Sequence, residues 1–342
     1  MKIASRLVDI EKPPLVIAEI GINHGGDIKV AKSMARLAAQ SGAECIKHQT
    51  HFVDDEMTAE AKTIYPPNAQ SSIWEVMEQC ALDPDDELEL KQYAESLGLI
   101  YISTPFSRRA ADFLAEIEVP AFKIGSGEAD NLPLIRHIAG LGKPVIMSTG
   151  MQTIESLGAA VDILRGANIP FALLECTNLY PSPPEIVALQ GVTELREAFP
   201  DAVVGFSDHS VGPHMALASI PLGACILERH FTDTRYRSGP DVSCSMDPVG
   251  LREIIDRSRE IHTACRNRKH RSLAEEDVYR FARASVVADR DIQRGQMIGE
   301  EDIWVRRPGT GEIPPNSFDS VIGRRVVRDI KVNEQLRWSD LL

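Results

Sequence analysis

The chain has 342 residues and a formal net charge of −13. A protein this acidic is a poor partner for nucleic acid or for an anionic membrane, because both require a basic face. No apolar run approaches the roughly 20 residues of a membrane span, and the N-terminus lacks the apolar core of a signal peptide. We therefore expect a cytoplasmic protein that binds neither nucleic acid nor membranes.

Eight short apolar or β-branched runs are each followed at once by polar residues, and each run predicts a strand. In chain order they span residues 15–20, 43–47, 99–102, 121–124, 145–147, 171–176, 203–206 and 224–227. Segments with helical spacing lie between them, for example at 31–38 and 88–97. Because every strand end carries polar residues, the alternation favours an α/β fold of the (β/α)8 TIM-barrel type. An open doubly wound sheet would gather its chemistry at one switch point.

The barrel leaves residues over for a second domain. A TIM barrel takes about 250 residues, and its predicted closing helix at 251–265 leaves 266–342. Residues 266–280 are polar, change from basic to acidic and show no apolar period, which predicts a linker. Short strand-like runs follow at 284–288, 295–298, 303–305 and 326–327. We expect a barrel domain at 1–265, a linker at 266–280 and a small, mostly β domain at 281–342.

The six cysteines stand far apart and form no Cys-x-x-Cys pair. Three of them lie in or at the end of predicted strands. We therefore expect free thiols rather than disulfides, a zinc site or a cysteine nucleophile.

Two histidines end neighbouring predicted strands in the same phase. Ser207 and His209 are two residues apart on the seventh strand, as are Glu228 and His230 on the eighth. Residues two apart share a face, so both imidazoles can converge on one point as a divalent-metal site. No third His or Cys stands beside them, which suits Mn²⁺ or Mg²⁺ with water and substrate oxygens better than closed tetrahedral Zn²⁺. A lone histidine there would more often be only a polar strand-end residue; His24, His48, His51 and His214 have this weaker claim.

Cations and hydroxyl or amide donors gather at the other strand ends. Lys47 and Lys123 stand at two of them, and the donors are Thr104, Ser126, Ser148, Asn178 and Ser207. Together they predict a site for a small ligand with a phosphate and a carboxylate. Two alternatives stay open. Either lysine can be a rim residue with an exposed ammonium group, or Lys123 can form a Schiff base as in pyruvate-dependent aldolases.

Glu19 and Glu128 are the carboxylates best placed to transfer a proton or to orient a water molecule, although a strand-end Glu often only pairs with lysine. Asp241 follows a Gly-Pro turn that would hold it at the barrel mouth.

The chain carries a series of short motifs in one order. They are EIGINH at 19–24, KHQTH at 47–51, STPFS at 103–107, KIGSGE at 123–128, STGM at 148–151, CTNLYP at 176–181, GFSDH at 205–209, LERHFT at 227–232, GPD at 239–241 and WVRRPG at 304–309. On these motifs the chain resembles bacterial N-acetylneuraminate (sialic acid) synthases along nearly its whole length. The last motif lies in a segment that is similar to an antifreeze-like (SAF) domain.

The resemblance implies condensation of phosphoenolpyruvate with open-chain N-acetylmannosamine and water, giving N-acetylneuraminate and phosphate by carbon–oxygen cleavage. It implies a divalent metal ion bound by His209 and His230, with Mn²⁺ as the expected ion and Mg²⁺ as the alternative. Glu128 would handle the water and Glu19 would support the metal side. Phosphoenolpyruvate would lie on Lys47, Thr104, Lys123, Ser126, Ser148, Asn178 and Ser207. The sugar would contact Gln49, Asn68, Tyr180, Asp241, Phe281 and Arg307.

By the same resemblance, the SAF domain of one subunit caps the barrel of the other in a domain-swapped homodimer, and Arg307 reaches the N-acetyl group of the sugar. Sister enzymes that make legionaminic or pseudaminic acid from 2,4-diacetamido-trideoxy sugars are the alternative, although residues 47–57 look like the sialic acid branch. A Schiff-base pyruvate lyase and a non-catalytic carbohydrate-binding protein are further alternatives. Glu175 and the pair Ala129-Asp130 depart from the residues that are familiar in the family.

Overall fold

The structure is a computed structural model that describes residues 1–66 and 70–342. It divides into two compact units, Met1–Asn267 and Arg268–Leu342, and each is described by itself. The predicted sugar-binding residue Asn68 lies outside the described residues.

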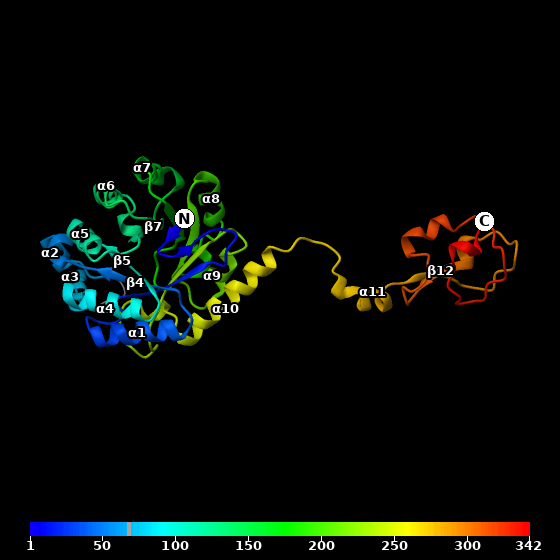
Figure 1. Cartoon of the computed structure of the whole chain (residues 1–342), viewed down its shortest axis with the longest axis horizontal. Coiled ribbons are helices and arrows are strands. Elements are labelled where there is room, and N and C mark those ends of the chain that lie inside the picture. The colour runs from blue at the N-terminus through cyan, green and yellow to red at the C-terminus, as the bar shows by residue number, and fades with distance from the viewer. Residues whose placement is uncertain (67–69) are drawn as a thin grey trace. The chain divides into compact units, whose positions relative to one another are not determined.

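The first unit is a closed barrel of eight parallel strands with helices outside it (Figure 1). The strands are β3 (Leu15–Gly21), β4 (Cys45–Thr50), β5 (Ile100–Pro105), β6 (Phe122–Ile124), β7 (Val145–Ser148), β8 (Phe171–Cys176), β9 (Val203–Asp208) and β10 (Ile226–His230). A small antiparallel pair, β1 (Lys2–Ile3) and β2 (Arg6–Leu7), precedes them. Each predicted run coincides with one barrel strand, so the predicted fold is confirmed.

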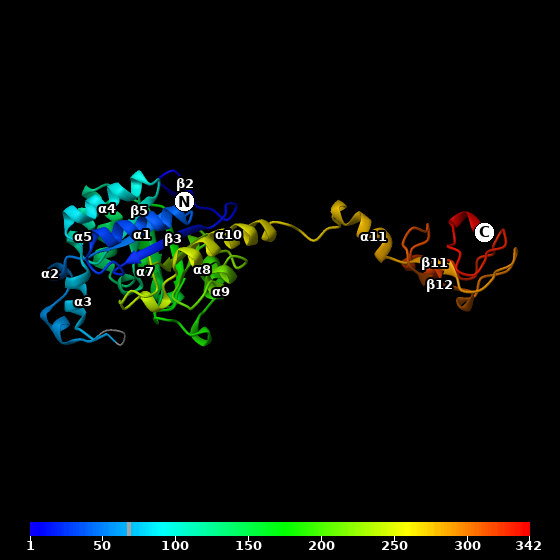
Figure 2. The same cartoon turned by 90° about the horizontal axis from the view of Figure 1, so that it is seen from below.

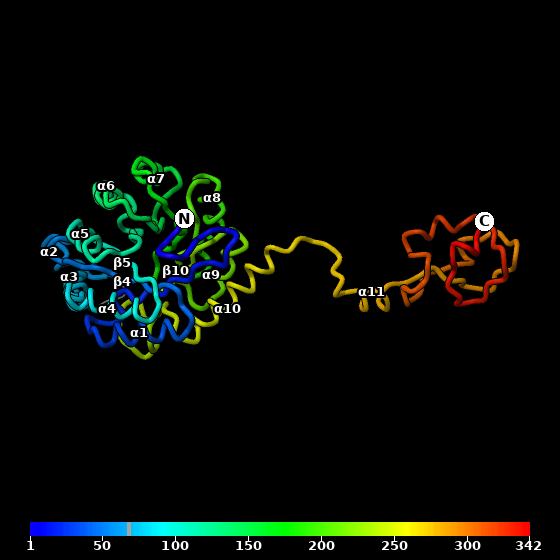
Figure 3. The backbone as a smooth tube through the Cα atoms, viewed as in Figure 1, coloured from blue at the N-terminus to red at the C-terminus, as the bar shows by residue number. Residues whose placement is uncertain are grey.

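Helices alternate with the strands and surround them, as the positions of β4, β5 and β10 inside the ring in Figure 3 show. They are α1 (Ile28–Gln40), α2 (Val53–Glu56), α3 (Ile73–Cys80), α4 (Pro84–Ser96), α5 (Arg108–Glu116), α6 (Leu132–Gly140), α7 (Ile154–Gly166), α8 (Gly191–Ala198), α9 (His214–Ser219) and α10 (Pro248–Cys265). Many begin at a residue whose side-chain oxygen accepts a backbone N–H, for example Asp27 before α1 and Asp247 before α10. The last helix of this unit, α10, lies beside the first, α1, and so completes the ring of helices (Figures 1 and 2).

Side chains that alternate between the inside and the outside of the barrel determine where the polar residues gather. Along β10, Ile226 packs among the apolar residues that fill the barrel, and Glu228 and His230 follow at the same phase. Leu227, between Ile226 and Glu228, packs against the helices. Other strands repeat this change from apolar to polar along their inward faces, for example Cys45 followed by Lys47 on β4. The inward polar residues therefore meet at the carboxyl ends of the strands.

The second unit pairs β11 (Ser285–Ala288) with β12 (Ile303–Arg306) in an antiparallel sheet over its own apolar core. Its one α-helix among the described residues, α11 (Glu276–Ala282), overlaps the predicted linker. The sequence did not predict this helix because it buries no residue and so has no apolar period. A capping box between Ser272 and Glu275 starts the turn that precedes it.

All six cysteines are free, and four of them are buried, as predicted. In the part of the chain that the structure describes, no helix is both long enough and apolar enough to span a bilayer.

Glu175 of β8 sets a pH dependence of stability. A Cβ atom on Gly191 of α8 would lie 2.4 Å from Glu175 Oε2, so the carboxyl group is packed against that helix. Burial raises its pKa from 4.5 to about 7. Because the folded state holds this proton more tightly, stability falls as pH rises from about 4.5 through about 7.

We therefore expect Glu175→Gln to raise the free energy of unfolding at pH 8 by about 2 kcal/mol, allowing for partial exposure. The gain should shrink as pH falls toward 4.5, the ordinary pKa of the group. Urea unfolding at several pH values measures the gain in the free energy of unfolding and its dependence on pH. An equal gain at every pH would contradict the assignment.

Candidate active site

A cavity of about 180 Å³ opens at the carboxyl end of the barrel. Its lining includes all seven residues predicted to hold the phosphate and carboxylate ligand, together with the two predicted metal ligands and two predicted sugar contacts. The lining residues are Lys47, Gln49, Thr104, Phe106, Lys123, Gly125, Ser126, Gly127, Ser148, Cys176, Asn178, Tyr180, Ser207, His209, Glu228 and His230. Closure of the barrel thus brings together residues from seven of its eight strands, β4 to β10, or from the segments that follow them.

Three buried charged residues, Lys47, Lys123 and Glu228, line this cavity, and a fourth, Glu19, lies against Lys47. Lys47 contacts Glu19 directly, and its Nζ lies 3.7 Å from Glu228 Oε1. Lys123 Nζ lies 3.5 Å from the same Glu228 oxygen. Although burial alone would raise the pKa of Glu228, the ammonium groups of Lys123 and Lys47 lower it below its usual value. Burial lowers the pKa of Lys47 to about 8, so its ammonium form still predominates at neutral pH. We call Glu19, Lys47, Lys123 and Glu228 the charge cluster.

Hydroxyl and amide groups surround the charge cluster. Lys123 donates to Ser148 Oγ at 2.7 Å, and Lys47 donates to Thr104 Oγ1 at 3.2 Å. Ser126 Oγ accepts the backbone N–H of Gly150 at 3.1 Å. A Cβ atom on Gly150 would lie 2.1 Å from Asn178 Oδ1, so only glycine leaves room for that amide. These groups offer hydrogen bonds to an anion whose charge the lysines balance.

The two predicted metal-binding histidines lie together. β9 and β10 pair in register, and the ring centroids of His209 and His230 are 5.3 Å apart. His209 Nδ1 donates to the carbonyl oxygen of Thr177 at 2.9 Å, which leaves Nε2 with a lone pair. Burial lowers the pKa of His209, and burial together with His209 lowers that of His230. Both rings are therefore neutral at pH 7, the form that binds metals.

The donor set fits an open metal site. Within residues 1–66 and 70–342, no group of three or more His, Cys, Asp and Glu side chains is arranged to hold a metal ion. A divalent ion on His209 and His230 would therefore complete its shell with water or substrate oxygens. Asp241 Oδ2 lies 3.7 Å from His230 Nδ1, and Tyr180 packs on His209 with ring centroids 4.1 Å apart. Burial raises the pKa of Asp241 to about 6.

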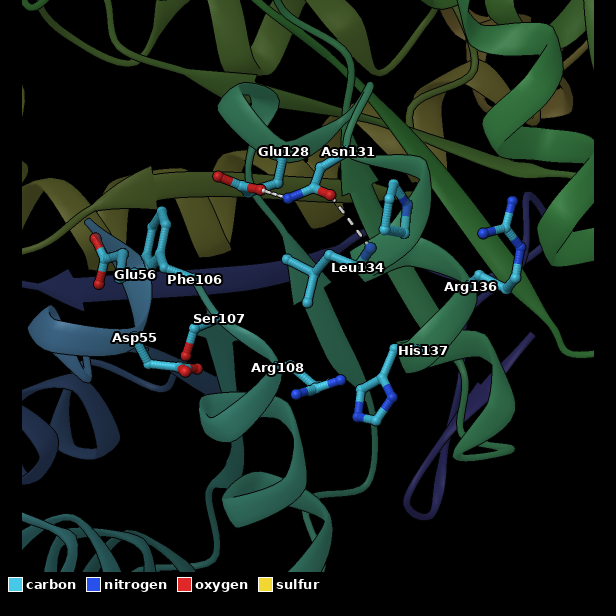
Figure 4. Close-up of a pocket in the computed structure, with 11 residues that line it drawn as sticks. Asp55, Glu56, Phe106, Ser107, Arg108, Glu128, Asn131, Leu134, Arg136 and His137 are labelled. Carbon is cyan, nitrogen blue, oxygen red and sulfur yellow. Dashed lines mark hydrogen bonds between the residues drawn. The ribbon is translucent and has the colours of Figure 1, made fainter. Parts of the chain in front are cut away.

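Glu128 is separated from the other predicted catalytic residues. The chain turns after β6 into a short 3₁₀ helix, Ser126–Glu128, which carries the carboxylate over the rim. There it accepts a hydrogen bond from Asn131 Nδ2 at 2.5 Å and faces an adjoining cavity of about 620 Å³ (Figure 4). Burial raises the pKa of Glu128. Phe106 lines both cavities and so marks their common edge.

Glu228 is the residue that sequence reasoning missed. It was noted only for sharing a face with His230, although that phase already places it inside the barrel. Its contacts with both lysines depend on side chains from three strands, which strand alternation alone does not reveal. Two predicted sugar contacts, Phe281 and Arg307, belong to the second unit, where both are exposed. Their contact with the sugar stays a prediction.

Comparison with known proteins agrees with this arrangement. The model of the NeuB family matches residues 34–270, and that of the SAF domain matches 283–342. The N,N'-diacetyllegionaminic acid synthase of Campylobacter jejuni is 34% identical, over 95% of this chain and 99% of that protein. The human N-acetylneuraminate-9-phosphate synthase is 32% identical, over 97% of this chain and 93% of that protein.

A crystal structure of the N-acetylneuraminic acid (sialic acid) synthetase of Leptospira borgpetersenii, in complex with citrate, is also similar. It superposes with a TM-score of 0.72 at 27% identity, covering 78% of this chain and 90% of that one. The family match covers well over half of the chain, and these relatives align with it over most of their length. The chain therefore belongs to the NeuB family and ends in a SAF domain.

Proposed function

We propose that this protein condenses phosphoenolpyruvate with open-chain N-acetylmannosamine and water to give N-acetylneuraminate and phosphate. The observation that carries the proposal is one cavity that holds two buried lysines, a ring of hydroxyl and amide donors and two neutral histidines. The names of the relatives above support a sugar acid synthase.

Phosphoenolpyruvate would bind with its phosphate and carboxylate on Lys47, Lys123 and the surrounding donors. Without this ligand, Glu228 balances the two ammonium groups. The donors fix the orientation of the ligand, so that its C3 faces the acceptor aldehyde. Positioning of this kind replaces a chance encounter with a near-attack geometry.

A Mn²⁺ ion, or Mg²⁺ in its place, held by His209 and His230 would supply a Lewis acid for the aldehyde oxygen. Thr177 keeps His209 in the tautomer that presents Nε2, and Asp241 stands beside His230. The ring of Tyr180 packs on that of His209.

The reaction forms a bond between C3 of phosphoenolpyruvate and the aldehyde carbon. Water then adds to C2, and the tetrahedral product loses phosphate by cleavage of its carbon–oxygen bond. We assign the orientation of this water to Glu128, whose carboxylate faces the adjoining cavity. Glu19 keeps Lys47 in place. We also propose a homodimer with exchanged SAF domains, in which Arg307 of the partner subunit completes the sugar site.

The acceptor decides between the first candidate and legionaminic or pseudaminic acid synthesis; the name of the Campylobacter relative supports legionaminic acid synthesis. Among the described residues that line the cavity, the only Lys or Arg side chains are Lys47 and Lys123, both in the charge cluster. We therefore expect phosphate release with N-acetylmannosamine to exceed that with its 6-phosphate at least tenfold.

The assay compares these two sugars with 2,4-diacetamido-trideoxy hexoses at equal concentration and measures inorganic phosphate. Faster turnover of a diacetamido sugar than of N-acetylmannosamine would favour legionaminic or pseudaminic acid synthesis over N-acetylneuraminate synthesis. Absence of phosphate release with every sugar would overturn both.

A further inference from the structure

A line of polar side chains leads from the charge cluster to the rim of the barrel. Gln49 Nε2 lies 3.5 Å from Glu19 Oε1, and Gln49 Oε1 lies 3.3 Å from His51 Nε2. His51 Nδ1 lies 2.8 Å from Glu56 Oε2 on α2. The His51 ring is buried and stacks on Phe106, with centroids 4.6 Å apart and planes at 12°. No step of the proposed reaction uses His51 or Glu56.

The partners along this line fix the orientation of the Gln49 amide. Glu19 contacts the ammonium group of Lys47, so it is a carboxylate that can only accept hydrogen bonds. The amide nitrogen of Gln49 must therefore face Glu19, and the amide oxygen must face His51. That oxygen also only accepts, so His51 Nε2 carries a hydrogen.

The other ring nitrogen completes an ion pair. His51 Nδ1 faces the carboxyl group of Glu56, and this contact too needs a hydrogen between the two atoms. A ring nitrogen that donates to a carboxylate oxygen carries the hydrogen of that contact, and we assign it to the ring. Donation from both nitrogens makes His51 an imidazolium paired with the Glu56 carboxylate.

We propose that the ion pair of His51 and Glu56 positions Gln49 so that it offers one N–H donor to the acceptor sugar. This rests on the proposed function. The oxygen of Gln49 is held by His51 and one amide hydrogen by Glu19, which leaves the second amide hydrogen for the cavity that Gln49 lines. Gly21 makes room for this arrangement, because a Cβ there would lie 2.7 Å from Glu19 Oε1 and 3.0 Å from Gln49 Nε2.

The first test is steady-state kinetics of Glu56→Gln in the metal-loaded full-length enzyme. Without the carboxylate, the ring loses the charge that strengthens its donation to Gln49 Oε1, so the amide is held less firmly in this orientation. We expect the KM for the acceptor sugar to rise about tenfold while the KM for phosphoenolpyruvate stays within twofold. The matched control is Asp54→Asn, which removes the same charge from an exposed position of α2 and should change neither value. Unchanged acceptor KM in Glu56→Gln, or an equal rise of both KM values, overturns the proposal.

The second test does not depend on turnover. In the ¹⁵N-histidine spectrum of the full chain, the His51 signals among the nine histidines are assigned by their loss in His51→Gln. We expect both ring nitrogens to carry hydrogen at pH 7 in the natural protein and in Asp54→Asn, and only one in Glu56→Gln. A neutral His51 ring in the natural protein overturns the proposal. If the ring is charged but no sugar supports phosphate release, the ion pair stands and the proposed function falls.

Discussion

Treatment with EDTA is expected to abolish phosphate release, and added Mn²⁺ is expected to restore it. The two histidine rings are neutral, buried and 5.3 Å apart, so they can hold a divalent ion without first losing a proton. The enol of phosphoenolpyruvate is a weak nucleophile that needs a polarised aldehyde, and the cavity residues alone supply no comparable Lewis acid. The measurement is phosphate release before chelation, after it and after addition of Mn²⁺ or Mg²⁺.

Single variants test which residues hold the ion. His230→Asn should lower kcat by at least about a thousandfold, because one imidazole and open positions bind divalent ions weakly. The amount of metal bound per protein chain, measured by elemental analysis, should fall together with kcat. His214→Asn on α9 is the control, since His214 is exposed. Full activity in the chelated protein, or normal metal content in His230→Asn, would contradict the assignment.

Lys123→Met is expected to lower kcat/KM for phosphoenolpyruvate by about a thousandfold and to destabilise the fold by roughly 3 kcal/mol. The substitution removes a charge that the ligand needs. It also leaves Glu228 with Lys47 at 3.7 Å as its remaining lysine partner. Stopped assays at varied phosphoenolpyruvate give the kinetic loss, and urea unfolding gives the stability loss. Lys12→Met, on the exposed N-terminal segment, should be neutral in both measurements.

The same lysine distinguishes the Schiff-base alternative. Lys123 Nζ donates to Ser148 and lies beside Glu228, which suits an ammonium that binds an anion. Treatment with pyruvate and borohydride should therefore leave the mass of the natural protein unchanged. A pyruvate-derived adduct on Lys123, together with activity that survives EDTA, would make the protein a lyase instead.

Several parts of the candidate site were predictable because they depend on local pattern. Lys47, Lys123 and His230 each lie in or just after an apolar run, in the inward phase, and a parallel barrel gathers such residues at one mouth. Glu128 shows where this reasoning fails. It follows a strand closely in sequence, but the turn after β6 directs it to the adjoining cavity. The course of a turn depends on what it packs against, which the sequence pattern does not contain.

The amino-acid sequence by itself determined the order of strands and helices, the inward and outward faces of the strands and the family motifs, because each of these is a short-range pattern. Only the tertiary structure decided which charges meet. Pairing of β10 with β3 closes the barrel and brings Glu228 to Lys47, far apart along the chain. Packing of neighbouring strands likewise stacked His51, which follows β4, on Phe106, which follows β5. Contacts between elements arise from closure and packing, and no periodicity within one element encodes them.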